Sequence, residues 1–298
     1  MLNGLINIKK EQDFTSNDVV AKLRGIVRQR KIGHTGTLDP QATGVLPVCL
    51  GNATKLCDFM TEKDKEYVAT LRLGLISDTQ DIWGEVSEQK EVNVSPEQLR
   101  DALEQVKQKG EQVPPMYSAI SIGGKRLYEL AREGKVVERP ARPVRIDAIE
   151  ILSYEAPDAK IRVLCGKGTY IRTICADAGE ILGCGAVMTS LVRTKVGIFP
   201  LEEAYTLSQV EQIRDEGRLE EILLPTDRIL QQYPALHIRE VARRYLYNGN
   251  PLTKESFRET VTEEGTCYRI YDTEDRFCAL YKGKEGRLFP EQMFLPEK

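Results

Sequence analysis

Apolar residues recur at helical spacing near the start of the chain. They follow Thr15 and Ser16, which can cap a helix. The apolar positions are Val19, Val20, Leu23, Ile26 and Val27. Farther along, apolar and polar residues alternate from Tyr67 to Gly74, which is typical of a half-buried strand. The pattern therefore predicts a first helix with one buried face, and a strand that begins at Tyr67.

The middle of the chain contains both helix-like and strand-like patterns of apolar residues. Ser95, followed by Pro96 and by Gln98 three positions after the cap, predicts a second helix. The turn signal at 123–125 predicts a hairpin, two strands are expected at 144–152 and 160–165, and a helix is expected to end at Gly183. Because these elements interleave irregularly over short connections, we expect an α+β fold with a mixed, largely antiparallel sheet.

The pattern changes after about residue 200. The segment 207–224 reads as a very acidic helical region, and 268–290 reads as short strands separated by turns. We therefore predict two domains, a larger one over residues 1–225 and a small β-rich one over residues 226–298.

Composition narrows the class of protein. The 298 residues carry a formal net charge of −3, but the stretch 22–31 has five basic residues and no acid, and 124–145 is also rich in basic residues. Such patches can supply phosphate contacts or can be plain solvated helix faces. The first residues carry neither an uninterrupted apolar stretch nor a small-residue cleavage site, no apolar run reaches membrane length, and the seven cysteines lack metal-ligand spacing. We expect a cytoplasmic protein with reduced thiols, no metal and no membrane contact.

The stretch GHTGTLDPQATGVLPV, residues 33–48, carries one acid, Asp39. Pro40 biases Asp39 away from helix, and the glycines allow close backbone approach, so this stretch is a loop. Locally, such an aspartate is more often a turn former than a catalyst. The chain has two histidines and lacks a G-x-S-x-G elbow, a Walker A loop and a Rossmann fingerprint. If Asp39 is catalytic, covalent attack by its carboxylate is the principal remaining role.

The stretch from Gly33 through Lys55 resembles the catalytic motif of the TruB family of tRNA pseudouridine synthases. Further matches follow in family order, at 64–74, 116–134, 141–146, 166–173, 182–186 and 191–199. They cover roughly the first 200 residues. The last third is similar to a small RNA-binding domain of PUA type, a weaker match that includes YLYNGNPL. One departure is that Glu11 and Asp13 replace the Pro and Gly of the family's K-P-x-G-x-[TS]-S segment.

The resemblance implies a cofactor-independent isomerase that converts uridine-55 in the TΨC loop of tRNA to pseudouridine. It implies that Asp39 is the nucleophile, attacking C1′ of the ribose or C6 of the base. Arg172 pairs with Asp39 and keeps it anionic. Tyr67 stacks on the target base and is a second candidate catalytic group, as acceptor of the C5 proton.

The resemblance also implies three substrate-binding positions. Tyr170 and Leu191 line the uracil pocket, and His34 helps to hold the flipped nucleotide. The T-arm of tRNA is then the partner, bound by a monomer that needs no protein partner. The alternatives are a non-catalytic RNA-binding or RNA-chaperone protein, which would not need Asp39, and a related synthase that acts within a guide-RNA complex.

Overall fold

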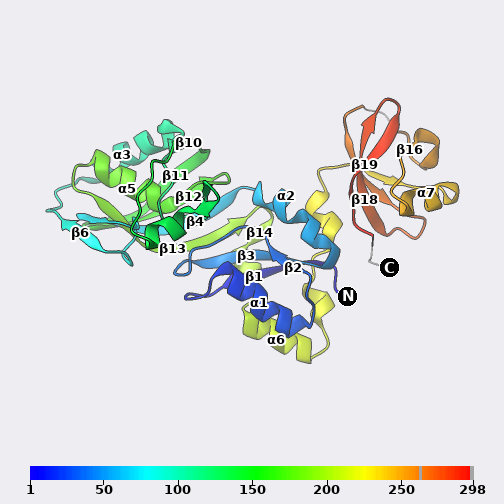
Figure 1. Cartoon of the computed structure of the whole chain (residues 1–298), viewed down its shortest axis with the longest axis horizontal. Helices are drawn as coiled ribbons and strands as arrows, with labels where there is room; N and C mark the ends of the chain where they lie inside the picture. Colours follow the sequence, from blue (N-terminus) through cyan, green and yellow to red (C-terminus); the bar gives the residue numbers. More distant parts are fainter. Residues whose placement is uncertain (262–263, 296–298) are drawn as a thin grey trace.

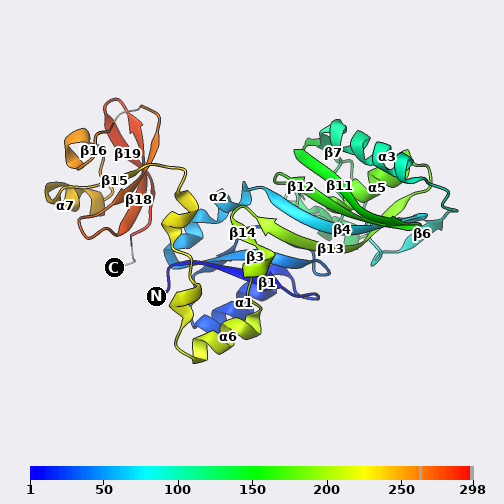
Figure 2. The same ribbon diagram turned by 180° about the vertical axis from the view of Figure 1, so that it is seen from behind.

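The computed structural model describes residues 1–261 and 264–295 (Figures 1 and 2). One part of the molecule contains a large sheet and the helices that pack on it. The other part contains a small, separate sheet. The N-terminus lies near the junction between them, beside the segment that leads to the small sheet.

The large sheet has the order β1-β3-β13-β4-β12-β11, and β2 and β14 pair with β3 and β13 at its periphery. Its strands are β1 (Gly4–Lys10), β2 (Ile32–His34), β3 (Thr43–Leu50), β4 (Lys65–Leu73), β11 (Ile146–Glu155), β12 (Asp158–Cys165), β13 (Ala186–Val196) and β14 (Phe199–Pro200). Every pair is antiparallel except β3 with β13. The predicted fold class, α+β with a mixed, largely antiparallel sheet, is confirmed.

Seven α-helices occur in the described part of the chain. They are α1 (Ser16–Val27), α2 (Cys57–Thr61), α3 (Pro96–Lys109), α4 (Leu127–Arg132), α5 (Ile171–Ile181), α6 (Leu207–Asp215) and α7 (Arg243–Tyr247). Thr15 and Ser95 cap α1 and α3 through capping boxes, as their sequences predict. Helices α3 and α5 pack together on the half of the sheet that contains β4, β11 and β12 (Figure 2). Helices α1 and α6 pack together beside β1 and β3.

Strand β4 runs through the middle of the sheet and shows the predicted alternation. Its odd-numbered positions from Lys65 to Leu73 are buried, and its even-numbered positions are more exposed. The strand begins at Lys65 rather than at Tyr67, because residues 65 and 66 already pair with β12 and β13. Lys65 and Tyr67 therefore lie on the same buried face.

Short strands also form separate two-stranded sheets. They are β5 (Leu75–Ser77) with β6 (Val86–Gln89), β7 (Glu111–Gln112) with β10 (Arg142–Pro143), and β8 (Ser121–Ile122) with β9 (Lys125–Arg126). The last pair is the hairpin predicted at 123–125. The 3₁₀ helices are η1 (Gly51–Leu56), η2 (Leu201–Glu203), η3 (Leu219–Ile222), η4 (Thr226–Leu230), η5 (Glu240–Ala242) and η6 (Lys254–Ser256).

The acidic region 207–224 is not one helix. Helix α6 ends at Asp215, Gly217 adopts a φ of +74°, and the chain resumes as η3. Leu207 and Val210 pack against α1, and the Arg214 guanidinium donates a hydrogen bond to the Ile26 carbonyl (3.2 Å). The acidic segment therefore docks on the first helix.

The small sheet has its own core and a contact with the rest of the chain. Its order is β15 (Ala235–His237), β17 (Cys267–Tyr271), β18 (Phe277–Lys284), β19 (Arg287–Met293), β16 (Leu252–Thr253). Leu280 and Phe294 pack in a hydrophobic cluster with residues of β1, β3, α2 and η4. Lys55 donates a hydrogen bond to the Met293 carbonyl (2.7 Å). The β-rich character of the C-terminal part is confirmed, whereas the boundary between residues 225 and 226 stays a prediction.

Candidate active site

A cavity of about 260 Å³ opens where several stretches of chain meet in the large sheet region. The loop 36–39 forms one wall, and residues 117–119 and 166–172 form others. Strands β4 and β13 supply Lys65, Tyr67, Leu191 and Arg193. The cavity thus brings together five of the six predicted site residues: Asp39, Tyr67, Tyr170, Arg172 and Leu191.

Asp39 lies in the loop between β2 and β3, as predicted. The Ser16 hydroxyl accepts a hydrogen bond from the Leu38 N–H (2.9 Å), and the buried Lys10 ammonium donates to the Pro40 carbonyl (2.9 Å). Lys10 also donates to the carbonyls of Glu11 and Phe14. The two residues that flank Asp39 are therefore fixed from β1 and from the start of α1, so the loop presents Asp39 in one orientation.

Arg172, in the first turn of α5, contacts Asp39 as predicted. Its Nε lies 3.0 Å from Asp39 Oδ2, and its Nη2 lies 3.3 Å from Oδ1. The Arg172 side chain is 5% exposed, whereas that of Asp39 is 41% exposed. A substrate can therefore reach the carboxylate while the arginine behind it stays buried.

Backbone carbonyls hold the guanidinium of Arg172 in place. Nη1 donates to the Thr79 carbonyl (3.0 Å) and Nη2 donates to the Tyr117 carbonyl (2.9 Å). Nη1 also lies 3.6 Å from a second carboxylate, Asp81 Oδ2. Because these bonds use the planar fork of an arginine, lysine could not reproduce them.

Asp81 was not singled out from the sequence. Its carboxylate accepts hydrogen bonds from the Thr79 hydroxyl (2.6 Å) and from the Trp83 N–H (3.1 Å). It lies in a polar turn, where aspartate is common for local reasons, so the sequence gives no signal that it faces Arg172. A second acid thus shares the arginine that pairs with Asp39.

Tyr67 and Tyr170 lie on different elements around the cavity. Tyr67 is on the buried face of β4, and burial raises the pKa of its phenol, while the charge of Arg193 partly opposes this rise. Tyr170 caps α5, and its backbone N–H and carbonyl both bond to the side chain of Gln112 (2.9 and 3.1 Å). Burial likewise raises the pKa of Tyr170. Both phenols are therefore neutral at pH 7.

His34 does not line this cavity. It is the last residue of β2, and its Nδ1 accepts a hydrogen bond from the Gly36 N–H (3.3 Å). Burial, and then the charge of Arg193, lower the pKa of His34, so its imidazole is neutral at pH 7. Its predicted contact with the substrate stays a prediction.

Arg193 and Lys65 are cavity residues that sequence reasoning did not identify. The buried Arg193 donates to the carbonyls of Val45 (2.7 Å), Gly36 (3.3 Å) and Thr37 (3.5 Å). A Cβ on Gly44 would lie 2.2 Å from the Arg193 carbonyl oxygen, so this glycine permits the close crossing of β3 and β13. The close approach expected from the glycines is thus partly an approach to the protein's own backbone.

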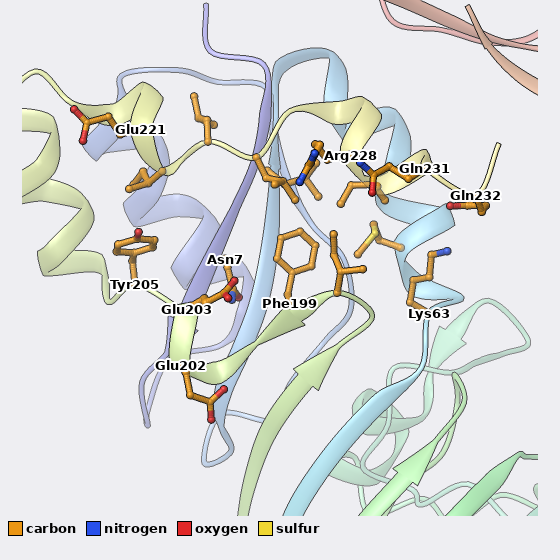
Figure 3. Close-up of a pocket in the computed structure, with 17 residues that line it drawn as sticks. Asn7, Lys63, Phe199, Glu202, Glu203, Tyr205, Glu221, Arg228, Gln231 and Gln232 are labelled. Atoms are coloured by element: carbon orange, nitrogen blue, oxygen red, sulfur yellow. The ribbon is translucent and has the colours of Figure 1, made fainter. Parts of the chain in front are cut away.

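A larger cavity of about 810 Å³ lies elsewhere, between β14, η2, η3 and η4 (Figure 3). It contains none of the predicted site residues. Its lining includes Phe199 and Ile229 together with charged side chains such as Glu202 and Arg228. It is therefore a separate feature of the junction near the small sheet.

Within residues 1–261 and 264–295, neither a cluster of metal-ligating side chains nor a bilayer-length apolar helix is present. No group of three or more His, Cys, Asp or Glu residues there is arranged to hold a metal ion. None of the helices in these residues combines the length and apolar character that a bilayer crossing requires.

Comparisons with known proteins decide the family. Residues 24–171 match the model of the TruB family pseudouridylate synthase N-terminal domain, and residues 172–231 match that of the tRNA pseudouridylate synthase B C-terminal domain. The chain belongs to the TruB family. The expected isomerase class, pseudouridine synthase, is thereby confirmed.

The similarity to TruB relatives extends over the whole chain. The tRNA pseudouridine synthase B of Lachnoclostridium phytofermentans is 48% identical, over 99% of this chain and all of that protein. The protein of the same name from Clostridium tetani is 42% identical, over 96% of this chain and 97% of that protein.

Solved structures show the same fold. A structure described as an H/ACA RNP bound to a substrate RNA containing 2′-deoxyuridine has a TM-score of 0.73 at 25% identity, covering 98% of this chain and 85% of that one. A Cbf5-Nop10-Gar1 complex has a TM-score of 0.73 at 27% identity, with the same coverage.

The structure accommodates the departure noted in the N-terminal segment. Asp13, at the position where the resemblance leads us to expect glycine, adopts a φ of +68°. Aspartate tolerates this left-handed conformation better than most residues. Lys10 keeps its bonds to the carbonyls of Glu11, Phe14 and Pro40. The loop that supports Asp39 thus forms without the family's usual Pro and Gly.

Proposed function

We propose that the protein is a tRNA pseudouridine synthase that converts uridine-55 of the TΨC loop to pseudouridine with Asp39 as nucleophile. The observation that carries the proposal is the Asp39–Arg172 pair at a cavity with Tyr67, Tyr170 and Leu191 in its wall. The curated relatives named tRNA pseudouridine synthase B support tRNA as the substrate.

The reaction needs an anionic nucleophile beside a bound base. Asp39 attacks C1′ of the ribose or C6 of the uracil, the N1–C1′ bond breaks, and C1′ rejoins the base at C5. The C5 proton is lost and N1 gains a proton, so the isomerisation needs no redox cofactor. Arg172 stabilises the carboxylate as an anion and orients it through two contacts.

Tyr67 serves best as a stacking surface. Its ring lies on the buried face of β4 and lines the cavity. Because burial raises the pKa of the phenol, Tyr67 is a poor acceptor for the C5 proton. Tyr170 and Leu191 complete the walls around the base. His34 lies outside the cavity, and we assign it a contact with the RNA next to the cavity.

The uridine must leave its stack to reach Asp39. The carboxylate lines the cavity, and enzymes that act on a base within a folded nucleic acid extrude that base into their site. Unstacking costs a few kcal/mol, which stacking on Tyr67 and phosphate contacts would offset.

We assign the T-arm of tRNA as the partner and a monomer as the active form, with the cytoplasm as its location. A synthase acting within a guide-RNA complex is the second candidate, because two similar structures are complexes, an H/ACA RNP bound to a substrate RNA and a Cbf5-Nop10-Gar1 complex. Identity to those chains is 25 to 27%, against 48% to a full-length tRNA pseudouridine synthase B. The comparison therefore favours the stand-alone tRNA enzyme.

The test is to mix the purified protein with an unmodified tRNA transcript and to map pseudouridine by carbodiimide treatment and primer extension. We expect one new stop that reports position 55, without added protein or guide RNA. A transcript without a stop, or with a stop only when a guide RNA is present, would contradict the proposal.

A further inference from the structure

Lys65 is a buried lysine in the wall of the catalytic cavity. It is 6% exposed and lies two residues before Tyr67 on the same buried face of β4. Its backbone pairs with Cys165 of β12 and Val196 of β13. The central strand therefore places this lysine and the tyrosine that is assigned to stack on the base in the wall of the same cavity.

The ammonium of Lys65 is not fully satisfied by the protein. It donates a hydrogen bond to the Thr61 carbonyl, and no carboxylate of the described residues forms an ion pair with it. A lysine ammonium has three N–H donors, so two remain for a ligand. Burying a cation without a negative partner is costly, and proteins rarely do so outside functional sites.

Burial and the charge of Arg193 disfavour the protonated form of Lys65. Burial, and then the charge of Arg193, lower its pKa to about 8. Cys165, Glu62 and Asp64 oppose this effect, but they do not cancel it. The other charged side chains at the cavity are those of Asp39, Arg172 and Lys167. An added negative charge next to Lys65 and Arg193 would therefore be stabilised.

The proposed reaction creates such a charge on the base. If Asp39 attacks C1′, the electron pair of the N1–C1′ bond leaves with the uracil, whose negative charge spreads over its ring oxygens. If Asp39 attacks C6, the electron pair of the C5–C6 double bond moves towards the C4 carbonyl oxygen. Either route makes a uracil oxygen more negative in the transition state than in the bound substrate.

We propose that Lys65 is a catalytic residue that donates a hydrogen bond to a uracil oxygen and stabilises the negative charge on the base. This inference rests on the proposed function. The lysine keeps its proton, so no further reactant is needed. Interactions that strengthen only as charge develops lower the barrier rather than the dissociation constant.

A phosphate of the RNA is the other anion that such a lysine could bind. The RNA chain must enter and leave the cavity, so its phosphates lie towards the mouth. Lys65 is 6% exposed and shares the buried strand face with Tyr67, which places it with the base. A phosphate contact would also strengthen tRNA binding, which the experiment measures separately.

The experiment compares Lys65→Met with the wild type in single-turnover pseudouridine formation and in tRNA binding. We expect the rate constant to fall by about 10²- to 10³-fold, as for removal of one oxyanion donor. We expect the tRNA dissociation constant to change less than about threefold, because the contact forms mainly in the transition state. Lys63→Met is the matched control, since Lys63 lies over the Phe59 ring (4.2 Å) and outside the cavity; it should keep the wild-type rate.

Two more variants separate charge from structure. Lys65→Gln can keep the hydrogen bond to Thr61 but carries no charge, so it should be as slow as Lys65→Met. It also replaces the Met variant if that one does not fold. Lys65→Arg keeps a cation, and its rate constant should be at least tenfold higher than that of Lys65→Gln.

Three outcomes would overturn this inference: a rate within threefold of wild type in the Gln variant, equal rates for the Gln and Arg variants, or a loss confined to tRNA affinity. Failure of the wild type to modify tRNA would instead overturn the proposed function.

Discussion

At the scale of the residue, the role assigned to Asp39 depends on the residues that surround it in space. Its local sequence is that of a turn. Its carboxylate nevertheless contacts the buried guanidinium of Arg172, which lies 133 positions later in the chain. That guanidinium also contacts Asp81 and two carbonyls. The arginine is therefore held before substrate arrives, and Asp39 is the exposed member of the group.

Replacing Asp39 tests its role as nucleophile. Asp39→Asn should reduce pseudouridine formation by on the order of 10⁴- to 10⁶-fold, because the amide cannot attack. Binding of tRNA should stay nearly unchanged. Tritium release from tRNA labelled at C5 of uridine measures the reaction. Asp13→Asn, in the adjacent loop, is the control and should be active; substantial release by Asp39→Asn would rule out the nucleophile assignment.

The buried Lys10 gives a pH-dependent stability. Burial lowers its pKa to about 8, against 10.5 for an ordinary lysine. Between these two values the unfolded chain binds more protons than the folded protein, so the contribution of Lys10 to the free energy of unfolding rises with pH. The destabilisation caused by Lys10→Met should therefore be larger at pH 9 than at pH 7. Urea unfolding of both proteins at the two pH values measures this, and an equal or smaller difference at pH 9 would contradict it.

At the scale of the element, the basic stretch 22–31, which spans the end of α1, contains two kinds of arginine. Arg24 donates hydrogen bonds to the carbonyls of Arg30 and Ile32 (3.0 and 3.2 Å), so its side chain holds the segment that follows α1 in place. Arg28 and Arg30 are exposed and form no ion pair within the described residues. A salt-dependence test of this face should therefore spare Arg24.

The double variant Arg28→Gln/Arg30→Gln tests whether this end of α1 binds RNA. We expect a higher KM for tRNA and an unchanged rate at saturation. The plot of log affinity against log salt should become shallower by about 1.5, if each arginine neutralises one phosphate. Arg218→Gln is the control, because Arg218 is already paired with Glu216 and Glu221. An unchanged slope in the double variant would assign this face to plain solvent exposure.

At the scale of the whole molecule, the small sheet is joined to the large sheet region by packing as well as by the chain. Phe294, 1% exposed, follows β19 and packs in the cluster that contains Leu5, Val45 and Met60. The Asn52 side-chain amide donates a hydrogen bond to the Phe294 carbonyl. The two parts should therefore unfold together.

Phe294→Ala tests this coupling. Loss of a buried phenylalanine should lower the free energy of unfolding by about 3–5 kcal/mol. It should also split one thermal transition into two, because the apolar contact between the parts is removed. Calorimetry of wild type and variant measures both effects. Two separate transitions already present in the wild type, or a variant that still melts in one transition, would refute the coupling.

Much of the fold could be predicted because local patterns act over short distances. The caps at Thr15 and Ser95 and the alternation in β4 depend on neighbours a few residues away, and all three appear as expected. The start of β4 and the end of α6 were misplaced, because strand pairing with β12 and β13 and the turn at Gly217 decide them. Asp81, which lies beside Arg172, and the cavity residues Arg193 and Lys65 were not predicted, because nothing in their local sequence marks them as part of the site.

The sequence by itself determined the family, the fold class and five of the residues that meet at the cavity, since motif spacing and periodicity are properties of the chain. Only the tertiary structure decided which charges face each other. The pairing of Asp39 with Arg172, the second acid at Asp81 and the buried ammonium of Lys65 come from strands and loops far apart in sequence. The physical reason is that electrostatic interactions depend on distance and burial, and folding alone sets both.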